Sequence, residues 1–192
     1  MQFFSTKGAL RGALPAALWA VALTACETPS DVHTHGSPIL NSDQAVLQEV
    51  GTGNLSELAK SVRAATARYH SPVQAARAGY VDPGPDECVA VPALGGMGYH
   101  WANFGLVDDN YDPMVPEVLL YEPGPQGQPR LVAIEYIVLN LGQAAPTFGG
   151  QPFDVGGTPV PAPHWSLHVW VHKNNPNGLF TPFNPNVSCP AA

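Results

Sequence analysis

Three regularly spaced histidines near the C-terminus are the first residues of this sequence whose types and spacing indicate chemistry. The segment His164–His172 reads His-Trp-Ser-Leu-His-Val-Trp-Val-His, with a histidine at every fourth position. Its β-branched and aromatic residues favour a strand. Strand side chains alternate between the two faces, so the histidines are expected on one face and an apolar row on the other. Because neutral imidazole is a common metal ligand, this face is a candidate metal-binding surface.

The spacing also shows that this strand cannot form a metal site by itself. Residues four apart along a strand are separated by about 13 Å, whereas ligand nitrogens lie about 2 Å from a bound zinc ion. We therefore predict that His168, in the middle of the strand, contributes to the site. His164 and His172, at the two ends, are expected at its rim or on the surface. The partners of His168 must come from other strands.

Two residues in other predicted strands are the best candidates for these partners. His100 lies in an aromatic run that follows the glycine-rich segment 95–98, and Glu135 lies in the apolar segment 130–139. Alternation places Glu135 on one face with Leu131, Ala133 and Ile137. Since burying an unpaired carboxylate is costly, Glu135 is expected to have a metal ion, a cation or a proton as its partner.

If these strands are neighbours, His100, Glu135 and His168 converge on one sheet face. Two histidines and a carboxylate are a usual ligand set for zinc, manganese, iron or copper ions, and His164 or His172 could complete it. Ligand histidines need partners that fix their orientation. The candidates for that role are Tyr99, Asn103, Tyr136 and Ser166.

The sequence leaves three interpretations of this group open. The first is a divalent metal site, with a metalloenzyme as one form of it. The second is a metal-free pocket for a small ligand, lined by Trp101, Trp165 or Trp170. The third is a structural or interaction lipoprotein without pocket chemistry, in which Glu135 is bonded to a histidine inside the protein. No nucleophile motif is present, and nothing in the spacing supports a pairing of Glu135 with a loop acid such as Asp154.

The N-terminus has the features of an export signal. Residues 1–25 combine Lys7 and Arg11 with a short apolar run, which indicates a signal peptide. The run ends in Leu23-Thr-Ala-Cys26, which resembles the bacterial lipobox, so we expect lipid modification of Cys26 and anchoring to a bacterial membrane, facing the periplasm. The alternative is an ordinary secretory signal that is cleaved after Ala25, and both interpretations export the chain. Residues 26–40 are predicted to be a flexible tether and residues 41–192 a single domain.

The remaining two cysteines predict a disulfide. With Cys26 assigned to lipid, Cys88 and Cys189 form an even pair in an oxidising compartment. A Cys88–Cys189 bond is the favoured interpretation, and two free thiols acting as metal ligands are the rival one.

The charge balance of the exported chain argues against a nucleic-acid partner. Without the signal peptide, six basic residues face 15 acidic ones, so no basic patch is available to meet phosphate. The membrane, through Cys26, and a metal or small molecule are the partners that we expect.

The elements expected to position these residues give an α+β fold. Three short helices are predicted. The first runs from Asn41 to Val50 and ends at Gly51 and Gly53. The second starts at Asn54 and breaks at Ser71-Pro72, and the third continues from there to Gly79. Strands are expected around His100, at 115–122 and 130–139 as a hairpin, and at 164–173. A long Gly- and Pro-rich loop, 142–163, is predicted to be a lid or a binding loop. The helices should pack on a mainly antiparallel sheet or partly closed barrel of about four to six strands.

Several short motifs together resemble a family of exported bacterial proteins that has no assigned function. The resemblance spans most of residues 60–190 and implies one domain with this order of motifs, and it supplies no catalytic residues. The motifs are Ala64-Ala-Thr-Ala-Arg-Tyr, Ala75-Ala-Arg-Ala-Gly-Tyr, Gly96-Met-Gly-Tyr-His-Trp, Pro116-Glu-Val-Leu-Leu-Tyr-Glu, Leu131-Val-Ala-Ile-Glu-Tyr, Leu167-His-Val-Trp and Asn184-Pro-Asn-Val-Ser-Cys.

Overall fold

The computed structural model of the chain describes residues 42–157 and 160–190, with side chains from Gly53 onward. The predicted signal peptide, the lipobox cysteine Cys26 and the tether lie outside the described residues. None of the helices in the described part of the chain has both the length and the hydrophobicity that crossing a membrane requires.

The helices lie at the start of the described region. Helix α1 spans Ser42–Thr66, the short 3-10 helix η1 spans Ala67–His70, and α2 spans Pro72–Arg77. The predicted helix end at Gly51 and Gly53 is wrong, because α1 continues through both glycines. Glycine costs a helix about 1 kcal/mol relative to alanine but keeps both backbone hydrogen-bonding groups, so it weakens a helix without ending it. The predicted break before Pro72 is confirmed, with the proline in the first turn of α2.

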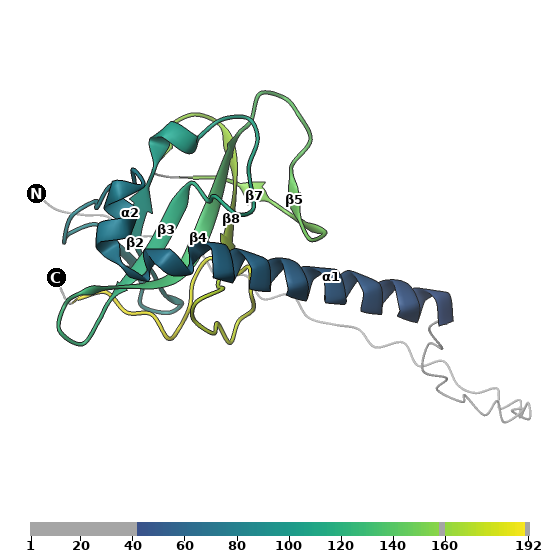
Figure 1. Cartoon of the computed structure of the whole chain (residues 1–192), viewed down its shortest axis with the longest axis horizontal. Coiled ribbons are helices and arrows are strands. Elements are labelled where there is room, and N and C mark those ends of the chain that lie inside the picture. Colours follow the sequence, from purple (N-terminus) through teal and green to yellow (C-terminus); the bar gives the residue numbers. More distant parts are fainter. Residues whose placement is uncertain (1–41, 158–159, 191–192) are drawn as a thin grey trace, which may run out of the picture. The chain divides into compact units, whose positions relative to one another are not determined.

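A six-stranded antiparallel sheet forms the body of the protein and confirms the predicted α+β fold (Figure 1). The strand order is β1-β2-β3-β4-β8-β7, and the sheet curves into a half-barrel. A separate two-stranded pair, β5 and β6, lies in the loop that precedes β7. The strands are β1 Cys88–Val91, β2 Gly95–Ala102, β3 Val118–Pro123, β4 Pro129–Leu139, β5 Thr147–Phe148, β6 Gln151–Pro152, β7 Asp154–Val155 and β8 His164–Val169.

The predicted hairpin is present as β3 and β4, with one irregularity that the alternation pattern did not predict. Leu120 pairs with Ala133 and Tyr121 pairs with Leu131, which leaves Val132 as an extra residue in β4. This β-bulge shifts the faces by one residue. Leu131 therefore packs in the main core with Ile134 and Tyr136, and its predicted placement on the face of Glu135 is wrong.

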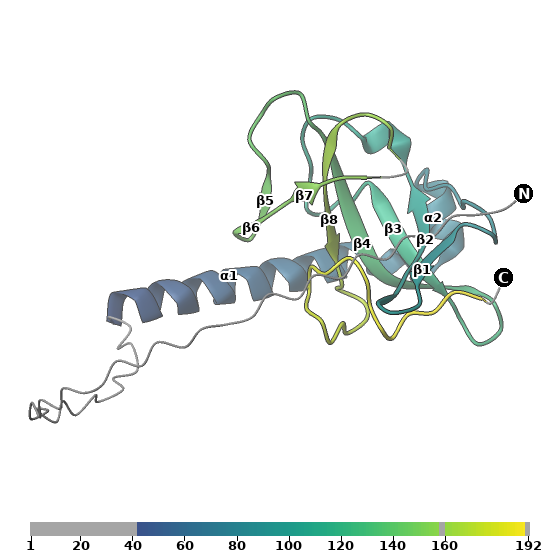
Figure 2. The same ribbon diagram turned by 180° about the vertical axis from the view of Figure 1, so that it is seen from behind.

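The main core lies between the sheet and the helices. Val62 of α1 and Tyr69 of η1 pack with Ile134 and Tyr136 of β4 and Val169 of β8, and all five are buried. Figures 1 and 2, which view the protein from opposite sides, show α1 on one side of the sheet. The other face of β4 carries Glu135, between a small apolar cluster around Ala133 and another around Ile137.

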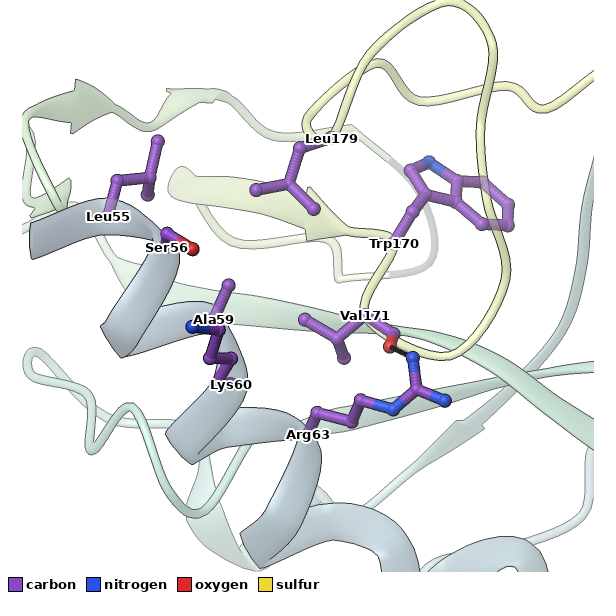
Figure 3. Close-up of a pocket in the computed structure, with 8 residues that line it drawn as sticks. All are labelled: Leu55, Ser56, Ala59, Lys60, Arg63, Trp170, Val171 and Leu179. Carbon is purple, nitrogen blue, oxygen red and sulfur yellow. Dashed lines mark hydrogen bonds between the residues drawn. The ribbon is translucent and has the colours of Figure 1, made fainter. Parts of the chain in front are cut away.

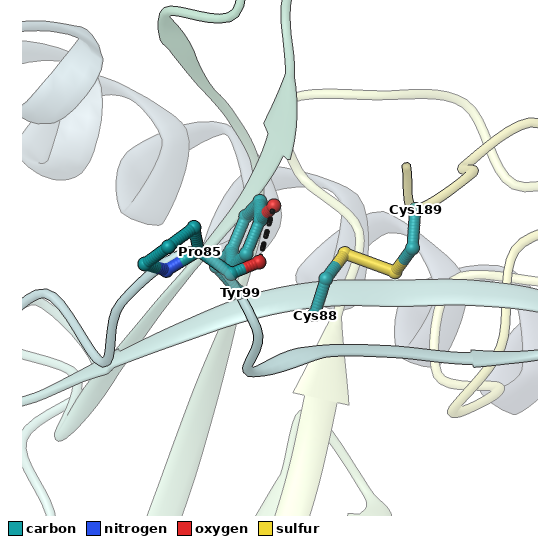
Figure 4. Close-up of a disulfide and its surroundings, with 4 residues drawn as sticks. All are labelled: Pro85, Cys88, Tyr99 and Cys189. Carbon is teal, nitrogen blue, oxygen red and sulfur yellow. Dashed lines mark hydrogen bonds between the residues drawn. A yellow bond between two sulfur atoms is a disulfide. The ribbon is translucent and has the colours of Figure 1, made fainter. Parts of the chain in front are cut away.

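The predicted disulfide is present (Figure 4). Cys88, the first residue of β1, is bonded to Cys189 near the C-terminus, with a Cα–Cα distance of 5.7 Å. Close by, the Tyr99 hydroxyl donates a hydrogen bond to the carbonyl oxygen of Pro85 at 3.2 Å. The disulfide ties the C-terminal segment to β1, the edge strand next to β2, which carries His100.

Candidate metal centre

Three strands bring His100, Glu135 and His168 together on one face of the sheet. Glu135 on β4 pairs directly with His168 on β8, so their side chains lie side by side on the same face. His100 on β2 comes from the other side of β3, which separates β2 from β4. Flat strands two apart are separated by about 9.6 Å, and the curvature of the half-barrel closes this gap.

The distances among the three side chains suit a shared ion. Glu135 Oε2 lies 3.8 Å from His100 Nε2, and Glu135 Oε1 lies 3.8 Å from His168 Nδ1. One ligand atom from each residue lies within 4.8 Å of the other two. Two ligands bound to one ion at about 2 Å each are at most about 4 Å apart, so a small contraction completes the coordination.

The three side chains are desolvated. Their exposed fractions are 14% for His100, 8% for Glu135 and 9% for His168. Burial raises the pKa of Glu135, against the opposing influence of His100, His164 and the Ser166 hydroxyl. Burial lowers the pKa of His168 to about 4, and it also lowers the pKa of His100, against the attraction of Glu135. Both imidazoles are therefore neutral at pH 7, which leaves both able to donate a lone pair to a metal ion.

Without a metal ion, His100, Glu135 and His168 do not form hydrogen bonds with one another. The 3.8 Å separations exceed the range of a hydrogen bond. Within the described residues, the buried Nε2 of His168 has no hydrogen-bond partner. Buried polar groups are normally paired, so the contacts within this group leave room for a further partner.

The group lines a cavity of about 570 Å³. Apolar residues from the loop before β1, from β1, from β2 and from the C-terminal segment form most of its wall, together with two acidic side chains. The lining residues are Pro83, Glu87, Val89, Met97, His100, Glu135, Asp154, Val155, Gly157, Ser166, His168, Pro182 and Phe183. The loop 142–163, which we predicted to be a lid or a binding loop, contributes residues to this wall.

His164 does not behave as predicted. It is only 4% exposed, so its placement on the rim or the surface is wrong. Its Nδ1 lies 2.8 Å from the carbonyl oxygen of Ala162, and a Cβ atom on Gly156 would approach its ring to 2.1 Å. The ring is held under the loop that leads to β8, and His164 is not a member of the metal-ligand group found among the described residues.

His172 lies beyond the end of β8, where the alternation of faces has stopped. Its Nε2 is 2.8 Å from the Thr66 hydroxyl, and its ring packs edge-on against His70 at 4.7 Å. It is thus on the helix side of the protein, away from Glu135. Neither His164 nor His172 completes the ligand set.

Among the residues predicted to orient the ligands, only Ser166 lies at the site, where its hydroxyl lowers the pKa of Glu135. The Tyr99 hydroxyl bonds to Pro85, the Asn103 amide bonds to Ala78, and the Tyr136 hydroxyl bonds to Pro113. The prediction for these three residues is wrong, because each side chain donates its hydrogen bond to a backbone carbonyl oxygen outside the site.

Trp101, Trp165 and Trp170 do not line this cavity, so the tryptophan lining predicted for a metal-free pocket is wrong. Trp101 packs in the main core against Tyr121, with ring centroids 4.8 Å apart. Trp165 packs against the same core. Trp170 donates its indole N–H to the carbonyl oxygen of Thr181 and lines a different groove.

This second groove lies between α1 and the segment that follows β8 (Figure 3). It has a volume of about 420 Å³, and Arg63 donates a hydrogen bond to the carbonyl oxygen of Val171 at its edge. Its other lining residues are Leu55, Ser56, Ala59, Lys60, Trp170 and Leu179. No histidine, cysteine or acid of the described part of the chain lines it, so these residues do not give it the chemistry of the first cavity.

Two acidic residues near the site were not proposed as site residues from the sequence. Asp154 reaches the cavity because β7 pairs with β8, with Asp154 directly opposite Ser166. Glu117 is 2% exposed and accepts a hydrogen bond from the backbone N–H of Ile137 at 3.0 Å. A lone acid directly before an apolar strand was the available signal for Glu117, and it differs from the signal that identified Glu135, which lies within an apolar strand.

Comparisons with protein-family models, with curated proteins and with solved structures found no match. The resemblance to a family of exported bacterial proteins stays a prediction, and the functional argument depends on the geometry of the site.

Proposed function

We propose that this protein binds one divalent metal ion through His100, Glu135 and His168. The observation that carries the proposal is the placement of three ligand atoms within 4.8 Å of one another in a buried position. Two neutral imidazoles and one carboxylate match the ligand sets of zinc, manganese, iron and copper sites. Zinc is the first ion to test, because His₂Glu sites are established for it.

The electrostatics of the group support the same proposal. An ionised carboxylate that is buried beside two uncharged imidazoles is destabilised by desolvation, and no lysine or arginine of the described residues pairs with it. A divalent ion would supply that charge and would give His168 and His100 a partner for their lone pairs. Three protein ligands also leave at least one coordination position for water or for a molecule in the cavity, which is the arrangement of a catalytic rather than a closed structural site.

The test is metal binding by protein purified without a histidine tag. After removal of metals with a chelator, we expect one zinc ion per chain, and thermal stabilisation of about 2.7 kcal/mol when free zinc is 100 times the dissociation constant. Glu135→Gln should abolish this stabilisation. His70→Gln is the matched control, because His70 is an exposed histidine outside the group, and it should bind zinc like the wild type.

Wild-type protein that takes up less than about 0.1 equivalent of zinc, manganese, iron or copper and shows no shift in melting would refute the proposal, because ligand binding to the folded state must stabilise it. The cavity would then be a candidate for a metal-free ligand. Unchanged zinc occupancy in the Glu135→Gln variant would remove Glu135 from the ligand set.

We also propose that the protein is exported and anchored to a bacterial membrane by a lipid on Cys26. The lipobox-like sequence Leu23-Thr-Ala-Cys26 supports this location. The Cys88–Cys189 bond is consistent with it, since disulfides persist in oxidising compartments outside the cytosol.

A further inference from the structure

We infer that the cavity at the metal centre binds a small organic molecule with an apolar body and a neutral or positive charge, and that it disfavours anionic molecules. The inference rests on the proposed metal site and specifies the class of ligand that would occupy its open coordination position. Its evidence is the size, the lining and the charge of the cavity.

The cavity has the dimensions of a small-molecule site. Its volume of about 570 Å³ lies within the range of about 300–1,000 Å³ that is usual for ligand pockets. His100, Glu135 and His168 form part of its wall. A molecule in the cavity is therefore in reach of a bound ion.

The rest of the wall is mainly apolar. Met97 of β2 and Val89 of β1 contribute from the sheet, and Pro83, Pro182 and Phe183 contribute from the loops beside it. Apolar walls with a few convergent polar groups are typical of sites that recognise the hydrocarbon body of a ligand and orient it by one end.

The charged side chains that line the cavity, apart from the metal ligands themselves, are both acidic. Asp154 lies opposite Ser166 in the β7–β8 pair, so it is held on the face of the sheet that carries the metal-ligand group. Glu87 stands in the loop before β1, and both carboxylates are exposed to solvent. They place negative charge on the solvent-exposed part of the cavity wall.

No lysine or arginine of the described chain lines this cavity to offset that charge. Lys60 and Arg63 line the other groove. Arg130 and Lys173 both pair with Glu122, and Arg68 lies over the ring of Tyr69. Arg77, at the end of α2, is the sixth basic residue, and it is not among the lining residues.

The bound ion and the acidic residues act in opposite directions on an anion. A divalent ion with one carboxylate ligand keeps a net positive charge and attracts an anionic head group, whereas Asp154 and Glu87 repel it. A suitable probe coordinates the ion through a neutral nitrogen and carries its charge at the other end of the molecule. The effect of that charge on the binding affinity then reports the influence of Asp154 and Glu87 separately from coordination to the ion.

Cobalt-substituted full-length protein provides the test, because the visible spectrum of Co²⁺ changes when a ligand enters its coordination sphere. The probes are para-imidazolylbenzylamine and para-imidazolylbenzoate, which share the neutral imidazole donor and the ring and differ in the charge at the far end. Phenylimidazole serves as the uncharged reference. We expect the amine to bind at least tenfold more tightly than the benzoate, with phenylimidazole between them.

The Glu87→Gln/Asp154→Asn double variant should still bind one cobalt ion per chain at saturating cobalt and should reduce the ratio between the two probes to about twofold or less, as expected if the carboxylates act as long-range charges. Glu57→Gln, which removes an exposed acid on α1, is the matched control and should leave the ratio unchanged. Cobalt bands that no probe perturbs, or a benzoate that binds as tightly as the amine, would overturn this inference alone. Failure to bind cobalt would overturn both this inference and the proposed metal site.

Discussion

Glu117 allows a quantitative test of how much a buried carboxyl group lowers the free energy of unfolding of this protein as pH rises. It is 2% exposed, and among the described residues its hydrogen bonds are to backbone, including the N–H of Ile137. Burial raises its pKa from 4.5 to about 8, with smaller contributions in the same direction from Asp108 and Glu135. The folded protein therefore holds a proton on Glu117 at pH values where the unfolded chain has released it.

The magnitude follows from linkage between protonation and folding. Between pH 4.5 and 8 the unfolded chain binds fewer protons at this position, so stability falls as pH rises and the whole penalty is present above pH 8. At about 1.4 kcal/mol for each pKa unit, a shift from 4.5 to about 8 corresponds to about 5 kcal/mol. This is an upper limit, because local rearrangement and water penetration reduce the penalty of a buried charge.

The perturbation is Glu117→Gln, which keeps the size of the side chain and an oxygen that accepts from the Ile137 N–H. We expect the variant to gain stability relative to the wild type as pH rises from 5 to 9, by at least about 2 and at most about 5 kcal/mol. The assay is urea unfolding of metal-free protein, followed by tryptophan fluorescence at several pH values.

Glu57→Gln is the matched control, because the side chain of Glu57 is 72% exposed and pairs only with Lys60 at the surface. Its effect should stay within about 0.5 kcal/mol at every pH. The reasoning would be refuted by wild-type and Glu117→Gln stabilities that run parallel across the whole pH range, since the carboxyl would then titrate at the same pH in the folded and unfolded chains.

Two further predictions concern the ends of the domain. A Cys88→Ser/Cys189→Ser variant should lose about 4–5 kcal/mol of stability in the chain-entropy model, because the bond joins residues 101 positions apart; an unchanged melting temperature, measured by calorimetry with and without reductant, would contradict this. Cys26→Ala should move the protein from the membrane to the soluble fraction of the producing bacterium, since acyl chains would no longer anchor it; equal membrane recovery of variant and wild type by immunoblot would rule out anchoring through Cys26.

Much of the candidate site could be predicted from local patterns. Alternation of apolar and polar residues places Glu135 within a buried strand, and the cost of burying a carboxylate makes it conspicuous there. The placement of His100 and His168 in strands follows from the residue types around them, but the predicted position of His168 in the middle of its strand is wrong, because β8 ends at Val169. The pairing of Cys88 with Cys189 follows from the count of cysteines once Cys26 is assigned to lipid.

Other features of the fold depend on contacts that no short segment contains. Helix α1 passes through Gly51 and Gly53, although the local preference of glycine is to end a helix. The bulge at Val132 moves Leu131 to the helix side of the sheet. His164, with the same spacing from His168 as His172, is buried under the loop that precedes β8, whereas His172 packs against α1 and η1.

The sequence by itself determined the types of side chain and the face of each strand on which most of them lie, because those properties depend on the local periodicity of the chain. The tertiary structure decided which strands are neighbours and how strongly the sheet curves. That curvature brings His100 within 3.8 Å of Glu135 across the intervening strand β3, and the pairing of β7 with β8 brings Asp154 to the cavity. Such contacts join residues far apart in the chain, so only the packed sheet establishes them.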